Sequence, residues 1–369
     1  MNPHANIQDP STVVMQPTTL CNLDCRYCYL PFRRDNHVMP AAVAEAVAEG
    51  VAEWSTDREV EILWHGGEPL AVGRVRLAAL MSAFDGLNVV HSVQTNATLI
   101  DDGWCEFIAR TGMRVGVSID GPASDNAQRT NLAGRPAFSA IMRGIEMLRA
   151  HDIPFSVIAV VSDPDPARAD AWYEWFAALG GTSLGVNIEE CEGVNTRDSR
   201  TDTDRTARFW AALIYAWHAN PTIRVREIDH VRGYSCAVLH NQPMSPPPID
   251  PLPTVAYDGA VTVISPELAG FDSPRHGPFT CGNVLDAPLP ALVDAGMRAP
   301  WVTEFLTGVD NCRATCPYFE LCGGAHPANK HFEHAGRLDG TQTAYCRNSK
   351  IALMEGALHH AEHHHNIVA

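Results

Sequence analysis

Short apolar runs alternate along the chain with longer stretches in which apolar residues recur every three or four positions. The short runs predict six β-strands, at residues 12–16, 60–64, 89–95, 115–119, 155–161 and 184–188. The longer stretches predict helices at residues 40–54, 74–84, 102–111, 138–151 and 167–179. In the first of these, Val43, Val47, Val51 and Trp54 fall on one helical face. Strands that alternate with helices predict a parallel sheet with right-handed crossovers.

The chain after residue 200 departs from this alternation. Residues 205–218 predict one more amphipathic helix. An Asp258-Gly259 pair between two apolar runs predicts a β-hairpin across residues 255–264, and residues 289–307 predict a helical stretch. We therefore expect two domains, an α/β unit at residues 1–230 and a smaller α+β unit at residues 231–369.

Composition excludes several classes of protein. Lys and Arg number 27 against 43 Asp and Glu, a net charge of −16, so we expect no nucleic-acid partner and no binding to an acidic membrane surface. The sequence has no apolar run of membrane-spanning length and no signal peptide, which predicts a cytoplasmic protein. Thiols stay reduced in that compartment, so the 11 cysteines indicate metal binding or catalysis rather than disulfides.

Three of these cysteines occur within eight residues, just after the first predicted strand. Cys21, Cys25 and Cys28 form a CxxxCxxC pattern, with Tyr27 before the third cysteine. Clustered thiolates are typical ligands of iron–sulfur clusters, and three of them leave one iron of a 4Fe–4S cluster without a protein ligand. The pattern resembles the signature of the radical S-adenosylmethionine (SAM) enzymes. A zinc site or three unrelated buried thiols is the alternative.

The residues after the second and third predicted strands extend this resemblance. Gly66, Gly67 and Glu68 belong to a GGEP string, in which the glycines allow a close approach of the backbone. This string resembles the radical SAM motif that binds the methionine amino group. Gln94 and Asn96, in a QTN string, resemble residues beside the SAM pocket of peptide-modifying members. An ordinary strand-to-helix turn and a polar helix cap are the alternative interpretations.

Polar residues also follow the fourth and sixth predicted strands. Ser118 and Asp120, with the later Arg129, resemble the family positions that hold the carboxylate and ribose of SAM, and an arginine fork suits a carboxylate. A plain surface arginine is the alternative. Glu189 and Glu190 are adjacent carboxylates that suit a basic substrate side chain or the role of proton acceptor. A solvated loop is the alternative for this pair.

The resemblance implies a fold, a mechanism and cofactors. The implied fold is a partial (β/α)6 barrel of the TIM type, in which the chemistry gathers at the carboxyl ends of the strands. The open iron of the cluster chelates SAM, and one electron from an external reductant cleaves the sulfonium carbon–sulfur bond. The 5′-deoxyadenosyl radical that results abstracts a hydrogen atom from the substrate.

Four further cysteines, Cys312, Cys316, Cys322 and Cys346, lie near the C-terminal end. Four thiols fully ligate one 4Fe–4S cluster, which suits electron transfer, and the layout resembles the SPASM extension of radical SAM enzymes that modify ribosomally made peptides. A structural zinc site is the competitor. SPASM domains usually hold a second auxiliary cluster. The hairpin here lacks that cluster's cysteine, and we expect the acidic residue that sulfatase maturases place beside it to be missing too. We therefore expect one auxiliary cluster.

Cys236 and Cys281 remain candidate ligands of a second auxiliary cluster, with buried structural thiols as the alternative. The strings at residues 187–190, 265–268 and 316–333 look like those of maturases that join an aromatic ring carbon to the β-carbon of a nearby residue, a cyclophane link. The implied substrate is a ribosomal precursor peptide. The alternatives are epimerisation, a thioether or ether link, sulfatase-type formylglycine formation, and a non-catalytic iron–sulfur or zinc-binding protein.

Overall fold

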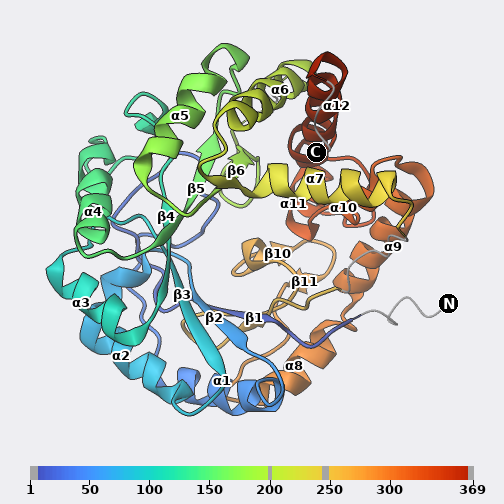
Figure 1. Cartoon of the computed structure of the whole chain (residues 1–369). Coiled ribbons are helices and arrows are strands. Elements are labelled where there is room, and N and C mark those ends of the chain that lie inside the picture. Colours follow the sequence, from blue (N-terminus) through green and yellow to red (C-terminus); the bar gives the residue numbers. More distant parts are fainter. Residues whose placement is uncertain (1–6, 198–201, 243–248, 365–369) are drawn as a thin grey trace.

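Nine strands form one curved sheet in the computed structural model, which describes residues 7–197, 202–242 and 249–364 (Figure 1). The strand order is β7-β6-β5-β4-β3-β2-β1-β8-β9, and each pair of neighbours from β1 to β7 is parallel. The first seven strands are β1 (Thr12–Met15), β2 (Val60–Trp64), β3 (Val89–Thr95), β4 (Arg114–Ser118), β5 (Phe155–Val161), β6 (Ser183–Ile188) and β7 (Arg224–Val225). These pairs confirm the predicted parallel sheet. Each strand from β2 to β7 lies beside the strand that precedes it in the chain.

Helices cover the outer face of this sheet (Figure 1). They are α1 (Ala41–Trp54), α2 (Arg74–Met81), α3 (Asp102–Thr111), α4 (Phe138–Ala150), α5 (Ala169–Leu179) and α6 (Thr203–Ala219). Helix α3 shows how local sequence sets these bounds. The Asp101 side chain accepts a hydrogen bond from Trp104 N at the start, and Gly112 ends the helix in the left-handed conformation. No helix of the described residues is long and apolar enough to cross a bilayer.

The C-terminal part lies between α1 and α6, on the side that the barrel helices leave open (Figure 1). Its strands are β8 (Thr254–Val255), β9 (Val261–Thr262), β10 (Asp272–Ser273) and β11 (Gly277–Pro278). Its helices are α7 (Arg226–Leu239), α8 (Leu289–Gly296), α9 (Pro300–Thr315), α10 (Phe319–Cys322), α11 (Pro327–Glu333) and α12 (Ala352–His364). Strand β9 pairs antiparallel with β8, which confirms the predicted hairpin, and β8 pairs parallel with β1.

The C-terminal part also departs from the predicted elements. The stretch predicted at residues 289–307 is two helices, because Pro300 cannot continue α8 and instead occupies the first turn of α9. Helices α7 and α12 were not predicted. The expected domain boundary after residue 230 falls inside α7, and the β8–β9 hairpin belongs to the barrel sheet. The two parts therefore share one sheet.

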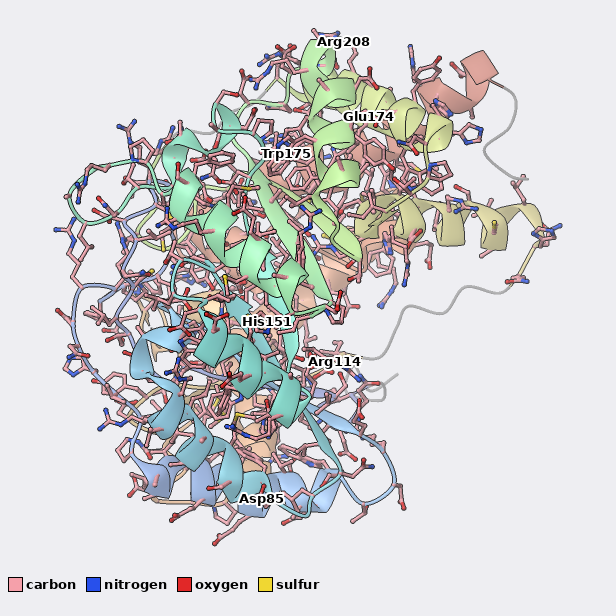
Figure 2. All side chains as sticks on the ribbon, turned by 60° about the vertical axis from the view of Figure 1, so that its left-hand side comes forward. Asp85, Arg114, His151, Glu174, Trp175 and Arg208 are labelled. Atoms are coloured by element: carbon pink, nitrogen blue, oxygen red, sulfur yellow. The ribbon has the colours of Figure 1, made fainter. Side chains whose placement is uncertain are left out.

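The polar strings identified in the sequence lie at one end of the parallel strands. They follow β1, β2, β3, β4 and β6, and the carboxyl ends of neighbouring parallel strands meet at the same edge. The opposite end is marked in Figure 2 by Asp85 before β3, Arg114 at the start of β4 and His151 before β5. The topology alone therefore brings residues from five separate loops to one end of the barrel.

Candidate active site and auxiliary cluster site

The cysteine loop between β1 and α1 is held in place by the loop after β4. Asp24 N donates a hydrogen bond of 2.7 Å to Thr130 O. Burial raises the pKa of the Cys21 thiol to about 12 and that of Cys25 to about 11, and it also raises the pKa of Cys28. Such thiols ionise when a metal supplies positive charge, and a trio of thiols is the donor set of a cluster with one open iron. The loop therefore fits the expected cluster.

Gly67 allows the turn after β2 to pack directly on the cysteine loop. Its φ is 61°, and a Cβ at this position would lie 2.5 Å from Leu20 O and 2.8 Å from Thr19 O. The neighbouring Gly66 also has a positive φ, of 90°. Glu68 N completes the contact with a hydrogen bond of 2.8 Å to Leu20 O. The glycines of the GGEP string therefore position the loop that carries Cys21.

The Glu68 side chain connects the turn after β2 to the loop after β3. Its carboxylate accepts hydrogen bonds from Leu70 N (3.1 Å), Thr95 Oγ1 (2.7 Å) and Asn96 N (2.8 Å), and the side chain is buried. Both of its carboxylate oxygens face donors of the protein itself, and the expected contact of Glu68 with SAM stays a prediction. The residue acts as a positioning group between two loops of the site.

Asn96 and Gln94 connect the motif loops on either side of β3. Asn96 Nδ2 lies 2.9 Å from Asn22 Oδ1 and 3.9 Å from Cys21 Sγ, so an amide donor reaches a predicted cluster ligand. Gln94 Nε2 donates a hydrogen bond of 2.8 Å to Ser118 Oγ at the end of β4. The structure thus brings the QTN string next to both the cysteine loop and the Ser118 position.

Asp120 is the centre of a buried network that joins β4, β5 and the cysteine loop. It accepts hydrogen bonds from Tyr27 OH (2.6 Å), from Arg129 Nε (3.0 Å) and Nη2 (2.9 Å), and from Val160 N (2.9 Å). The guanidinium of Arg129 also lies 5.4 Å from the centre of the Tyr27 ring. Two of the Arg129 donors face Asp120, and the expected contact of Arg129 with SAM stays a prediction. The network therefore fixes Tyr27 between the second and third cysteines.

Glu189 and Glu190 are neighbours at the end of β6 but occupy different surroundings. Glu189 is buried, and its Oε1 lies 3.3 Å from Arg197 Nη1. Glu190 instead accepts a hydrogen bond from Asn329 Nδ2 of helix α11. Burial raises the pKa of Glu190 to about 8, against the opposing effect of the Asn329 hydrogen bond. A carboxyl group with a pKa near neutrality suits proton transfer, whereas Glu189 is paired with Arg197.

Three further carboxylates near Glu190 were not identified from the sequence. Burial raises the pKa of Glu192, and the Glu190, Glu267 and Glu333 charges raise it further. Asn329 Nδ2 lies 3.3 Å from Glu192 Oε2, so one amide contacts both glutamates. Glu267 lies in the loop after the β8–β9 hairpin, and the expected loss of the acidic residue beside the hairpin cysteine stays a prediction. The signal for Glu267 was present in the SPEL string of residues 265–268.

The four C-terminal cysteines line one pocket of about 580 Å³, part of which is open to solvent. Cys312 and Cys316 lie on and just after α9, Cys322 ends α10, and Cys346 begins a π-helical turn (Cys346–Ile351). A hydrogen bond from the Cys346 thiol lowers the pKa of Cys322 to about 6 and raises the pKa of Cys346. Four sulfurs around one pocket fit the donor set of a fully ligated 4Fe–4S cluster.

The two remaining candidate ligands do not line this pocket. Cys236 is exposed on α7. Cys281 packs against Gly296 of α8, where an added Cβ would lie 2.4 Å from the sulfur. Among the described residues, no three Cys, His, Asp or Glu side chains gather closely enough to hold a single metal ion. The three-thiol loop and the four-thiol pocket are the places where the described cysteines collect.

Comparison with known sequences agrees with this arrangement. Residues 15–174 match the profile of the Radical SAM superfamily. The serine-type anaerobic sulfatase-maturating enzyme of Klebsiella pneumoniae is 32% identical over 345 residues, which cover 90% of this chain and 85% of that enzyme. The uncharacterized protein sll1766 of Synechocystis sp. is 32% identical over 359 residues, which cover 93% of this chain and 89% of that protein.

Solved structures share the whole fold. The structure of anSMEcpe with bound AdoMet has a TM-score of 0.74 at 20% identity and covers 96% of this chain and 98% of its own. Streptococcus suis SuiB bound to the precursor peptide SuiA has a TM-score of 0.68 at 16% identity and covers 93% of this chain and 77% of its own. With the three-thiol loop at the mouth of a parallel barrel and the identity to the Klebsiella enzyme over nearly the full length, the chain belongs to the radical SAM superfamily, among the relatives of the anaerobic sulfatase-maturating enzymes.

Proposed function

We propose that this radical SAM enzyme matures a ribosomally made precursor peptide by joining an aromatic ring carbon to the β-carbon of a nearby residue. As a member of its superfamily it uses a 4Fe–4S cluster and S-adenosylmethionine. Two relatives support a polypeptide substrate: the Klebsiella enzyme matures a sulfatase, and SuiB was solved with its precursor peptide SuiA. An external one-electron reductant is the further partner that this chemistry requires.

The residues of the barrel mouth have separate roles in this proposal. Cys21, Cys25 and Cys28 would hold the SAM-binding cluster, and the four C-terminal thiols the auxiliary one. When bound, the first cluster and SAM supply hydrogen-atom abstraction, and the auxiliary cluster supplies a one-electron acceptor. The buried pair of Asp120 and Arg129 fixes the cysteine loop against β4 and β5. The protein therefore orients the groups that would carry the reaction.

Helix α11 is the feature that carries the proposal. Asn329 on this helix contacts Glu190 at the barrel mouth, and the next residue, Lys330, has its Nζ 3.7 Å from Cys312 Sγ at the auxiliary site. A group that accepts a proton and a site that accepts an electron are therefore linked by two consecutive residues. Substitution on an aromatic ring requires both acceptors.

The atoms and electrons of the cross-link balance with this arrangement. A hydrogen atom leaves the substrate β-carbon, and a carbon–carbon bond forms to the ring. The ring then loses one proton and one electron to recover its aromaticity, so the peptide loses two hydrogens per link. Glu190 is the group we assign to that proton. Its pKa of about 8 leaves a fraction of the carboxyl ionised near neutral pH, and it is this fraction that accepts the proton, so product formation should rise with pH toward 8.

Sulfatase-type maturation is the second candidate, supported by Glu267 and by the Klebsiella relative. Glu267 lies in the loop after the hairpin and acts electrostatically on His65, Tyr29 and Glu190. Conversion of a serine to formylglycine also removes two hydrogens, but it leaves an aldehyde. Epimerisation leaves the mass unchanged and takes up deuterium from heavy water. These products are distinguishable on one sample.

The experiment is anaerobic co-expression with the short peptides encoded beside the gene, followed by mass spectrometry. We expect a loss of two hydrogens per link, missing fragment ions inside the ring, and no adduct with a hydrazide. A trapped hydrazone would instead establish formylglycine formation, and deuterium uptake at constant mass would establish epimerisation. Reconstituted enzyme that releases no 5′-deoxyadenosine with SAM and reductant would rule out radical SAM chemistry altogether.

A further inference from the structure

Lys330 is a fully buried lysine beside the auxiliary cluster site. Its side chain is 0% exposed, its Nζ lies 3.7 Å from Cys312 Sγ, and the ammonium lies 5.4 Å from the centre of the Phe305 ring. The facing position on α9 is Gly308, where an added Cβ would lie 2.7 Å from Nζ. The helix that carries Cys312 is therefore shaped to admit a compact ammonium at the sulfur.

The surroundings of Lys330 offer sulfur rather than carboxylate as a counter-charge. None of the ion pairs found among the described residues of this region involves Lys330. The side-chain contact of its Nζ is instead the sulfur of Cys312, at 3.7 Å. A buried ammonium is unfavourable unless an anion compensates it, and a cluster held by four thiolates is such an anion.

Lysine is rare in this chain, and both lysines lie at the auxiliary site. Lys330 and Lys350 are the only two lysines in 369 residues, and all other basic side chains apart from histidine are arginines. Both lysines adjoin the auxiliary site, since Lys350 lines the pocket of the four cysteines and lies 5.6 Å from the Tyr345 ring. An ammonium fits where the planar fork of arginine does not, in the space left by Gly308.

We propose that Lys330 donates an N–H···S hydrogen bond to the Cys312 ligand of the auxiliary cluster and thereby raises the reduction potential of that cluster. Hydrogen bonds to ligand sulfur and nearby positive charge stabilise the reduced, more negative state of an iron–sulfur cluster. Lys330 is thus a positioning and tuning residue that makes the site a better acceptor of an electron from the substrate. The inference rests on the proposed ligand set of Cys312, Cys316, Cys322 and Cys346.

The first test is a redox titration monitored by electron paramagnetic resonance. The full chain carries Cys21, Cys25 and Cys28 changed to alanine, so only the auxiliary cluster contributes a signal. We expect Lys330→Met to move the midpoint to a more negative potential, because the positive charge and the N–H···S hydrogen bond are both lost. Lys350→Met is the matched control, with a smaller shift. An unchanged midpoint in fully loaded Lys330→Met would overturn the inference.

A second test needs no change at Lys330. Protein that carries Lys350→Arg has Lys330 as its single lysine, so growth on ¹⁵N-lysine labels one side chain. Pulsed resonance of the reduced auxiliary cluster should then show a ¹⁵N coupling, and its absence would refute the hydrogen bond. A parent chain without iron and sulfide at this site would instead overturn the ligand set of the proposed function. A missing ¹⁵N coupling and a missing cluster are therefore distinguishable outcomes.

Discussion

Asn329 and Lys330 are consecutive residues of helix α11, and their side chains reach two different sites. The amide of Asn329 contacts Glu190 and Glu192 at the barrel mouth, whereas the ammonium of Lys330 lies 3.7 Å from Cys312 Sγ. Both side chains are buried, so neither contact is a solvent-exposed surface interaction. A movement of α11 would therefore change the contacts of Glu190 and Glu192 and the contact with Cys312 at the same time.

Glu190→Gln and Glu189→Gln form a matched pair that separates the two adjacent carboxylates. We expect Glu190→Gln to lower the rate of product formation by roughly 100-fold, the usual scale for loss of a general base, because the amide cannot accept the ring proton. Release of 5′-deoxyadenosine should continue, since hydrogen abstraction comes first. Glu189→Gln should keep most product formation, because Glu189 faces Arg197. Chromatography of nucleoside and peptide from the same reactions measures both quantities.

Glu190 should make the stability of the folded protein depend on pH. Its pKa is raised to about 8 in the folded protein from an ordinary value of 4.5, so the folded state holds a proton that the unfolded state has lost between these values. The free energy of unfolding contributed by this group is therefore greatest below about pH 4.5 and decreases as the pH rises toward 8.

Glu190→Gln removes the titration of this carboxyl group. Thermal unfolding of the variant and the parent at several pH values tests the predicted pH dependence. We expect the melting temperature of the variant, relative to the parent, to increase steadily between pH 5 and pH 8. Glu192 shares the proton equilibrium with Glu190, so the change belongs to the pair. A difference in melting temperature that does not vary with pH would show that the pKa of Glu190 is not raised in the folded protein.

The barrel could be predicted from the sequence because its strands are short buried runs that each pack beside the preceding one. A local pattern such as the apolar run of β5 (Phe155–Val161) suffices there, since neighbouring strands are also neighbours in the chain. Helix α7 was missed because its buried side chains, Glu227, Ile228 and Val231, cluster in its first turns and leave the rest of the helix exposed. Its apolar pattern is too short to show a helical period.

The roles of individual site residues depended on contacts that no local pattern contains. The sequence places Glu68 in a motif loop. Its partners Thr95, at the end of β3, and Asn96, just after it, could not be predicted from that loop alone. Glu189 and Glu190 look equivalent in the sequence. They differ in the fold because Asn329, far along the chain, reaches one of them.

Removal of the Asp120 carboxylate should destabilise the protein and release the first cluster. Asp120→Asn leaves the buried Arg129 without its counter-charge, at a cost of about 3–5 kcal/mol. It also weakens the hydrogen bond that holds Tyr27, so we expect lower iron content at the three-thiol loop. Asp125→Asn is the control, because its ion pair with the exposed Arg168 should contribute only about 0.2–1 kcal/mol. Chemical unfolding and iron analysis on both variants decide the point.

Gly67→Ala tests whether the turn after β2 positions the cysteine loop. The substitution combines a φ of 61° with a Cβ placed 2.5 Å from Leu20 O, so the backbone before Cys21 has to move. We expect the variant to keep the auxiliary cluster and lose the SAM-binding one. Gly112→Ala is the matched control, since Gly112 has a φ of 65° with nothing within 4 Å of the added Cβ. It should lose about 1–2 kcal/mol of stability from the backbone conformation alone and keep both clusters. Equal iron content in the two variants would show that Gly67 serves the turn and not the cysteine loop.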